Sequence, residues 1–352
     1  MAKRNANSGW SRGWSAFFAI VIILGGVAVS LGFGVRLRSA LERNAENRMA
    51  TASTSLELTV TEQLARYIDT VRLTAAALSS LDTPTARTFT DITTAVANQK
   101  LTATTGIRFV VPADPRSAGS VAPYWRDRGA RDLKIGKVAD IQEHLFTVFA
   151  RGLNGATAPP LGTDQGLVPA SVEVTRLART ANGVAVSDAY VQLGETKKAK
   201  ADQQLSFDVV APVAGADKRP AGYVMLSVSG TEFVTTLLAR SAGDLLDAQL
   251  VTRSGGGQLI EVATVLHAGR AADVRRAQDF QAGQRQWLLR TSADRDVLLP
   301  TAGRTDMVIV LAGSILAVMF GTLMYLQMSA TKRIEQEIEE EVEERLLAMD
   351  RL

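Results

Sequence analysis

The chain has 352 residues, no cysteine and only two histidines, His144 and His267. Without cysteine it can form no disulfide and has no thiolate nucleophile. Acid–base catalysis near neutral pH and most transition-metal sites recruit histidine. The sequence also contains no HExxH motif and no GxxxxGK[ST] phosphate-binding loop. We therefore expect no metal and no cofactor, and we interpret both histidines as solvated or core side chains.

The chain also has no large excess of positive or negative charge. The formal net charge is +3, and no basic stripe is interleaved with aromatic residues, so a nucleic-acid partner is not expected. Carboxylates such as Asp164, Asp188 and Asp208 would form a hydrolytic pair only if folding brought them together. The sequence gives no reason to expect that. It predicts no enzyme in this chain, with an extracytoplasmic hydrolase as a less favoured alternative.

Two long runs contain no charged residue at all, Trp14–Val35 and Met307–Met328. A helix of 22 residues reaches about 33 Å, which exceeds the roughly 30 Å hydrocarbon core of a bilayer. The first run is longer than the apolar core of a signal peptide, and no clear small-x-small cleavage site follows it before Arg36. The sequence therefore predicts two membrane-spanning helices, residues 14–35 and 307–328.

Basic residues at the two ends indicate the orientation of these spans. Three stand among residues 1–13, and Lys332 and Arg333 follow the second span. Cytoplasmic flanks carry an excess of such residues, so both termini are expected in the cytoplasm. Residues 36–306 are then extracytoplasmic, and the protein is expected to lie in the cell (inner or plasma) membrane in contact with lipid.

A long helix is expected directly after the first span. Residues 36–81 contain neither glycine nor proline, and apolar residues recur at helical spacing. We predict a stalk helix over residues 36–82. Its apolar stripe fits either a homodimer, in which two stalks pair, or a helix packed on its own globular domain. The stripe consists of Leu37, Leu41, Met49, Ala52, Leu56, Leu64, Ile68, Val71, Ala75 and Leu78.

Between stalk and second span, short apolar runs separated by turn residues predict strands with helices interposed. The regular alternation of a parallel sheet is absent, so we predict an α+β fold with antiparallel sheets. A break near residues 231–244 divides the region into two modules, 83–240 and 241–303. The expected strands are 107–111, 145–149, 184–193, 207–213, 222–228, 248–253, 259–265 and 285–291, and the expected helices include 124–131, 171–179 and 232–240.

The last segment, residues 331–352, is predicted to be an acidic signalling helix. Its apolar residues recur every four positions and glutamates cover the rest, a spacing that resembles a stuttered coiled coil. A single solvated amphipathic helix is the alternative. The tail has no histidine to phosphorylate, so a kinase or diguanylate cyclase output is expected outside this chain, in a longer protein or a separate partner. The apolar residues are Ile334, Ile338, Val342, Leu346 and Met349.

Several motifs between the two spans resemble a CHASE domain, the extracytoplasmic sensor of bacterial diguanylate cyclases and histidine kinases and of plant cytokinin receptors. The resemblance covers roughly residues 75–295, with the motifs in the family's order. They are GIRFVV (106–111), DLKI (132–135), LGTD (161–164), VTRLARTANGVAVSDAYVQL (174–193), FDVVAPV (207–213), residues 222–238 and FQAGQRQWLLR (280–290).

The resemblance implies a stalk helix followed by two PAS-like modules, a small molecule bound in the membrane-distal one, and a homodimer that passes movement through the second span. A membrane-tethered module that binds another protein is the alternative. Carried onto this sequence, the family's pocket implies ligand contacts from Leu133, Val148, Val186, Ser187, Tyr190, Phe207, Tyr223 and Leu226.

Overall fold

The computed structural model divides the chain into two compact units. The helical unit comprises residues 1–47 and 296–352, and the sheet unit comprises residues 48–295. The expectations for residues 1–6, for the basic loop Lys197–Lys200 and for residues 350–352 fall outside the described residues. Those described are 7–136, 139–192, 204–215, 219–253, 257–299 and 302–349.

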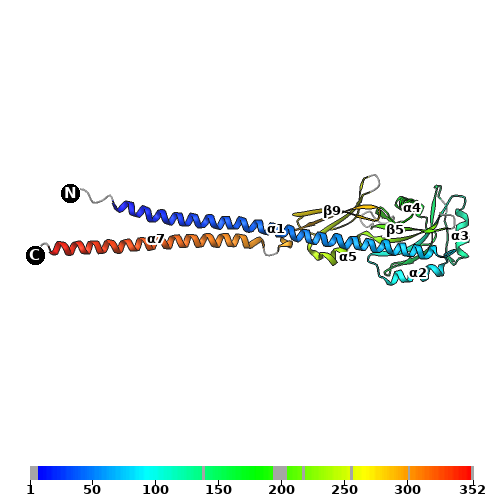
Figure 1. Cartoon of the computed structure of the whole chain (residues 1–352), viewed down its shortest axis with the longest axis horizontal. Coiled ribbons are helices and arrows are strands. Elements are labelled where there is room, and N and C mark those ends of the chain that lie inside the picture. Colours follow the sequence, from blue (N-terminus) through cyan, green and yellow to red (C-terminus); the bar gives the residue numbers. More distant parts are fainter. Residues whose placement is uncertain are drawn as a thin grey trace. The chain divides into compact units, whose positions relative to one another are not determined.

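Two helices carry the apolar runs. Helix α1 (Asn7–Ser79) is one unbroken helix of 73 residues that contains both the first run and the predicted stalk (Figure 1). Helix α7 (Ala302–Met349) joins the second run to the acidic tail in the same way. Each is long and apolar enough to cross a membrane, and only 6% of its most apolar window is buried within the chain. These windows are therefore not core helices of a soluble domain.

Small residues bring the two helices together inside the helical unit. A Cβ atom built on Gly26 would lie 2.5 Å from the Ala317 Cβ, and one built on Gly313 would lie 2.5 Å from the Ser30 Oγ. Gly34 and Gly321 approach the opposite helix as closely, meeting Val310 and Ile23 respectively. The α1 and α7 sequences thus interlock through glycine, serine and alanine at every fourth position, a spacing that lets helix backbones pack closely in lipid.

The sheet unit begins with the six-stranded sheet A, in which all described pairings are antiparallel. The order is β2-β1-β6-β5-β3, with β4 also paired to β5. Most of its strands are buried along almost their whole length, because helices cover both faces. Their bounds are β1 (Thr104–Ala113), β2 (His144–Gly152), β3 (Ala185–Val186), β4 (Tyr190–Val191), β5 (Leu205–Ala214) and β6 (Pro220–Ser229).

The four-stranded sheet B follows, in the order β8-β7-β10-β9 and again antiparallel. It contains β7 (Asp247–Arg253), β8 (Leu259–Val265), β9 (Val274–Ala282) and β10 (Arg285–Ala293). The α+β class with antiparallel sheets is thereby confirmed. Strand β9 was not predicted, because it is an edge strand whose residues, VRRAQDFQA, are mostly exposed and polar.

Short helices connect the strands. The predicted helix at 124–131 is displaced by about one and a half turns. Helix α3 begins at Ala118, after a turn in which the Asp114 carboxylate accepts the backbone N–H groups of Arg116 and Ser117. The single strand predicted at 184–193 is broken into β3 and β4. The other helices are α2 (Ala86–Asn98), α3 (Ala118–Arg126), η1 (Gln165–Leu167), α4 (Pro169–Ala181), α5 (Gly230–Ser241), η3 (Gly243–Leu245) and α6 (Arg295–Leu298).

The apolar stripe of α1 packs on its own sheet unit, so the second of the two interpretations of the stripe is confirmed. Tyr67 contacts the ring of Phe233 in α5, with ring centroids 5.9 Å apart. At one end Ser53 bonds Thr291 of β10 (2.7 Å), and at the other Ser79 bonds the Ala214 N–H of β5 (2.8 Å). The stripe therefore gives no support to a paired stalk. Its most buried members are Met49, Leu56, Leu64, Val71 and Leu78, and Val60, which was not predicted as part of the stripe, is equally buried.

The interlock of α1 and α7 predicts a specific cross-link. In the double variant Ser30→Cys/Gly313→Cys, the two Cβ atoms would lie 3.3 Å apart, near the distance that a disulfide requires. Mild oxidation of membranes should therefore give an intramolecular disulfide, seen as a mobility shift on a non-reducing gel. The chain has no cysteine of its own, so the background is clean.

The matched control is Ser30→Cys/Ile315→Cys, because Ile315 is exposed two positions further along α7. It should not cross-link within one chain. Adding Gly26→Leu to the first pair should weaken the cross-link, since the new side chain would meet Ala317. Equal cross-linking of both pairs would show that the helices do not pack in this register.

Candidate functional site

The eight predicted pocket residues are all buried, at 9% exposure or less, but they do not gather in one place. The register of sheet A puts Val186, Phe207 and Leu226 on one face, which we call the stalk face because Tyr67 and α5 pack there. Tyr223 lies on the opposite face, which α4 covers with Val174 and Ala178. We call this the α4 face.

The remaining four residues are also divided. Tyr190 lies on the α4 face, opposite Ser206, and Ser187 accepts the Asp208 N–H through its hydroxyl (2.8 Å). Val148 lies in β2 beside an irregularity of the β1–β2 pairing, and Leu133 lies in the loop after α3. Whether any of the eight contacts a ligand stays a prediction. Tyr190 and Ser187, however, belong to one buried polar network.

The centre of this network is an ion pair inside sheet A. The Arg108 guanidinium on β1 donates to the Asp208 carboxylate on β5 at 2.6 Å, and both side chains are at most 6% exposed. The Tyr190 hydroxyl donates to the same carboxylate oxygen (2.7 Å), and the Ser227 hydroxyl donates to the other (2.7 Å). Asp208 is therefore saturated by three donors from three strands, as a buried carboxylate requires.

Electrostatics favour the charged form of Arg108 and the neutral form of Tyr190. Burial tends to lower the pKa of Arg108, but Asp208 and Tyr190 outweigh it and the pKa is raised. Burial, and then the Asp208 carboxylate, raise the pKa of Tyr190, so its hydroxyl remains a donor. The Arg108 Nε has no partner within the described structure. The ion pair thus orders the sheet but leaves one buried donor unused.

A second ion pair connects sheet A to sheet B. Arg285, the first residue of β10, donates through Nε to the Val186 carbonyl (2.5 Å) and pairs with Asp188. The neighbouring Gln284 amide exchanges two hydrogen bonds with the Val186 backbone (3.0 and 3.1 Å). The β9–β10 turn is thus fastened to the β3–β4 loop. The turn leads into β10, the strand that precedes α6 and α7 in the sequence.

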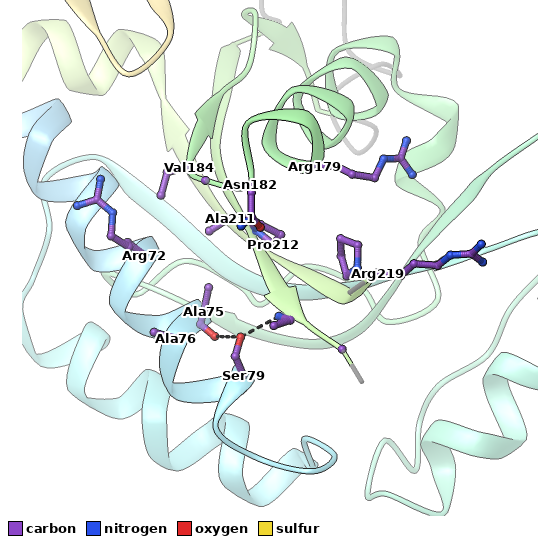
Figure 2. A pocket seen from close by; sticks show the side chains of 14 residues that line it. Arg72, Ala75, Ala76, Ser79, Arg179, Asn182, Val184, Ala211, Pro212 and Arg219 are labelled. Atoms are coloured by element: carbon purple, nitrogen blue, oxygen red, sulfur yellow. Dashed lines mark hydrogen bonds between the residues drawn. The ribbon is translucent and has the colours of Figure 1, made fainter. Parts of the chain in front are cut away.

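The open cavity of this region lies beside the sheet edge, between α1, the α4–β3 connection and β5, and measures about 690 Å³. We call it the edge cavity. In the described structure β3 pairs with Val209 and Val210 of β5, so from Ala211 onward β5 is paired on its β6 side and open on its β3 side. Pro212 lacks an N–H there, and the Ala214 N–H is taken by Ser79 of α1 (Figure 2).

Three arginines line the edge cavity, but their charges are largely compensated. Figure 2 shows Arg72 on one side, and Arg179 and Arg219 on the other. Arg72 pairs with Asp69 (2.7 Å) and Arg179 with Glu143 (3.0 Å). The cavity therefore offers a mixed polar and apolar wall rather than a strong anion site. None of the eight predicted residues lines it.

The histidines and the three carboxylates considered as a hydrolytic pair have separate structural partners. His144 is buried and bonds Asp164 (2.7 Å), which also accepts the Leu145 and Gly166 N–H groups. His267 bonds Asp247 (2.8 Å). Asp188 and Asp208 each pair with an arginine, as described above. Over the described part of the chain, no three His, Cys, Asp or Glu side chains form a group that could hold a metal ion.

Arg108 and Asp208, the two most buried charges, were not predicted as site residues. Each is a single charge within an otherwise apolar strand, and that is the signal by which they could have been found. They are 100 residues apart in sequence, so only the strand order β1-β6-β5 brings them together.

Comparison with protein-family models and with curated proteins finds no match. Among solved structures, the chain is similar to the periplasmic sensory domain of the Campylobacter jejuni chemoreceptor Tlp1, at 11% identity and a TM-score of 0.46 over 71% of this chain and 96% of that one. It is also similar to an extracellular ligand binding receptor from Desulfohalobium retbaense, at 11% identity and a TM-score of 0.40 over 68% and 39% of the two chains. At such scores neither likeness decides the fold or the function of this chain.

Because Arg285 joins β10 to sheet A, we predict a large loss of stability when Arg285 is replaced. Arg285→Met should lower the free energy of unfolding by about 3 kcal/mol, because it leaves Asp188 and the Val186 carbonyl without their buried partner. Thermal or urea unfolding of the full chain in detergent measures this.

The control is Arg290→Met on the same strand, since Arg290 is exposed and bonds only the neutral Gln249 amide (3.3 Å). Its cost should stay below about 0.5 kcal/mol. Equal losses for the two variants would mean that the Arg285 contacts do not join the sheets.

Proposed function

We propose that this chain is the receptor part of a two-span membrane sensor, with residues 36–306 outside the cell membrane and both ends in the cytoplasm. The observation that carries the proposal is the continuity of α1 and α7. In α1, an exposed apolar window of membrane length is continuous with the segment that packs on the sheet unit. In α7, a similar window is continuous with the acidic tail. A change in the sheet unit can therefore cross the bilayer as a displacement of helices.

The proposed input is a small molecule bound by sheet A. The edge cavity touches α1 through Arg72, Ala76 and Ser79 and touches β5 through Ala211 and Pro212. A ligand that fills it would push on the stalk and on the edge of the sheet together. The sheet is also linked to α7 by a second route, from the β3–β4 loop through Arg285 and β10. The route through α1 would lead to the first span, and the route through Arg285 and β10 would lead to the second.

The proposed classification is a CHASE-like sensor, in which residues 83–240 and 241–303 form two PAS-like modules. The acidic tail of α7 would transmit the signal to a kinase or cyclase output beyond this chain or in a partner. Homodimerisation through the tail is supported by Ile334, Ile338 and Val342, which are all more than half exposed on α7. Two copies that paired these side chains would bury the apolar row.

A second candidate is a membrane-tethered module that binds another protein. It is favoured by the burial of all eight predicted pocket residues, whose side chains are at most 9% exposed. The two functions differ in what should co-purify. Mass spectrometry of the native chain should find a small molecule in stoichiometric amount for a sensor, and a protein for a tethered module.

The proposed topology is tested by labelling single cysteines in a chain that otherwise has none. In intact cells, a membrane-impermeant maleimide should label Leu73→Cys in α1 and should not label Ile338→Cys in the tail. Both positions are exposed, at 69% and 55%, so access is not limited by packing. Labelling of Ile338→Cys before lysis, or of both positions equally, would contradict the topology.

The edge cavity is tested by filling it. Gly183 lines the cavity, and its nearest neighbour to an added Cβ is at an ordinary contact distance of 3.6 Å. Gly183→Phe should fold normally and abolish the rise in melting temperature that a bound metabolite gives, which corresponds to about 2.7 kcal/mol at a hundredfold excess over Kd.

The control is Gly119→Phe on α3, where an added Cβ meets nothing within 4 Å and the residue is outside the cavity. This variant should keep the response in a thermal-shift screen of a metabolite library. A ligand that stabilises the Gly183→Phe variant as strongly as the native chain would place the binding site elsewhere.

A further inference from the structure

The outer face of sheet B carries a second cavity, of about 610 Å³, which we call the arginine cavity. Its walls come from all four strands and from the loop before β9. The register places Arg290 beside Gln249 and Ala277, and Ser292 beside Asp247 and Arg275. The wall residues are Asp247, Ala248, Gln249, Thr264, Leu266, Ala272, Arg275, Arg276, Ala277, Arg290, Thr291 and Ser292.

The three arginines of this cavity have no carboxylate partner among the residues that the structure describes. Arg275 donates to the backbone carbonyl of Ala272 (3.2 Å), and Arg290 donates to the neutral amide of Gln249 (3.3 Å). Arg276 has neither a hydrogen bond nor an ion pair within the same described residues. In the edge cavity, by contrast, two of three arginines are paired with acids.

The single acid in the wall is already engaged. The Asp247 Oδ1 accepts both the backbone N–H and the ring Nδ1 of His267, each at 2.8 Å. By register Arg276 lies on the α1 side with Thr291, whereas Arg275 and Arg290 lie on the outer face, where Asp247 is the one acid in the wall. Like charges on one surface repel one another, and no carboxylate pairs with these arginines among the described residues.

A buried hydroxyl in the same wall also lacks a partner. The Thr264 Oγ1 on β8 is inaccessible to solvent and has no hydrogen bond within the described structure. A buried polar atom of this kind is normally satisfied by protein, water or a ligand. The Gln249 amide next to it already bonds Glu261 (2.8 Å). The cavity thus combines unpaired guanidinium donors with an unused hydroxyl.

We propose that the arginine cavity binds an anion with oxygen acceptors, of the phosphate or carboxylate type. The planar guanidinium fork matches such groups with two parallel hydrogen bonds. The same chemistry is offered by a free phosphate and by the headgroup of an anionic lipid. Strand β10 ends at Ala293 and α7 begins at Ala302, so an anion that bridges β9 and β10 would brace the strand that leads to the second span.

This site is separate from the edge cavity, and it requires neither the ligand nor the topology proposed above. If the receptor function failed, the charge arrangement on sheet B would still predict the anion. The two proposals therefore succeed or fail by different measurements.

The test uses the full chain in nanodiscs of neutral phosphatidylcholine. Calorimetric titration with inorganic phosphate, at ionic strength held constant with chloride because salt screens exposed charges, should show binding. Arg275→Gln/Arg290→Gln should weaken it by about tenfold or more, since each arginine contributes charge-assisted hydrogen bonds. The control Arg240→Gln/Arg253→Gln removes the same charge outside the cavity and should bind as the native chain does.

A second arm replaces part of the phosphatidylcholine by phosphatidylglycerol. If the lipid headgroup is the occupant, these discs should raise the melting temperature of the native chain but not of the Arg275→Gln/Arg290→Gln variant, and added phosphate should then have little further effect. Without any anion, that variant should melt no lower than the native chain, because it relieves repulsion. This result also shows that the variant folds.

The proposal is overturned if neither phosphate nor phosphatidylglycerol distinguishes the native chain from the cavity variant. It is equally overturned if the control pair loses as much binding as the cavity pair, because the effect would then be general surface charge.

Discussion

The burial of one stripe of α1 is the constraint on which the rest of the structure depends. Along the sheet unit the helix contacts sheet A through Ser79 and sheet B through Ser53, with Tyr67 against α5 between them. One helix therefore contacts both sheets. The same helix begins at Asn7, so the apolar run and the stalk belong to one secondary-structure element.

Buried charge adds specificity to this packing. Arg108–Asp208 joins β1 to β5 within sheet A, and Arg285–Asp188 joins sheet A to sheet B. Apolar contacts would tolerate small shifts between these elements, whereas a buried ion pair that loses its partner is strongly destabilised. The two pairs therefore favour one register and one docking of the β9–β10 turn.

The two cavities differ in the balance of charge, and that difference follows from their neighbours. At the edge cavity Glu143 and Asp69 neutralise two arginines, and the wall is completed by alanine, proline and backbone. On the outer face of sheet B, the acid in the cavity wall, Asp247, bonds His267, and the arginines of the wall have no acid partner among the described residues. The wall of the edge cavity is therefore close to neutral, whereas arginines dominate the wall of the cavity on sheet B.

Much of the fold was determined by the sequence alone, because it depends on local patterns. Uncharged runs predicted both membrane-length helices, helical spacing predicted the stalk, and alternation with turn residues predicted most strands. The exposed edge strand β9 was not predicted, since its polar residues resemble those of a loop. Tertiary structure alone decided that the α1 stripe faces its own sheets, and that Arg108 meets Asp208. It also decided that the eight predicted residues lie on different faces of sheet A and that the arginines of sheet B share one cavity. These outcomes depend on strand order and register, which join residues far apart in the chain and leave no local trace in the sequence.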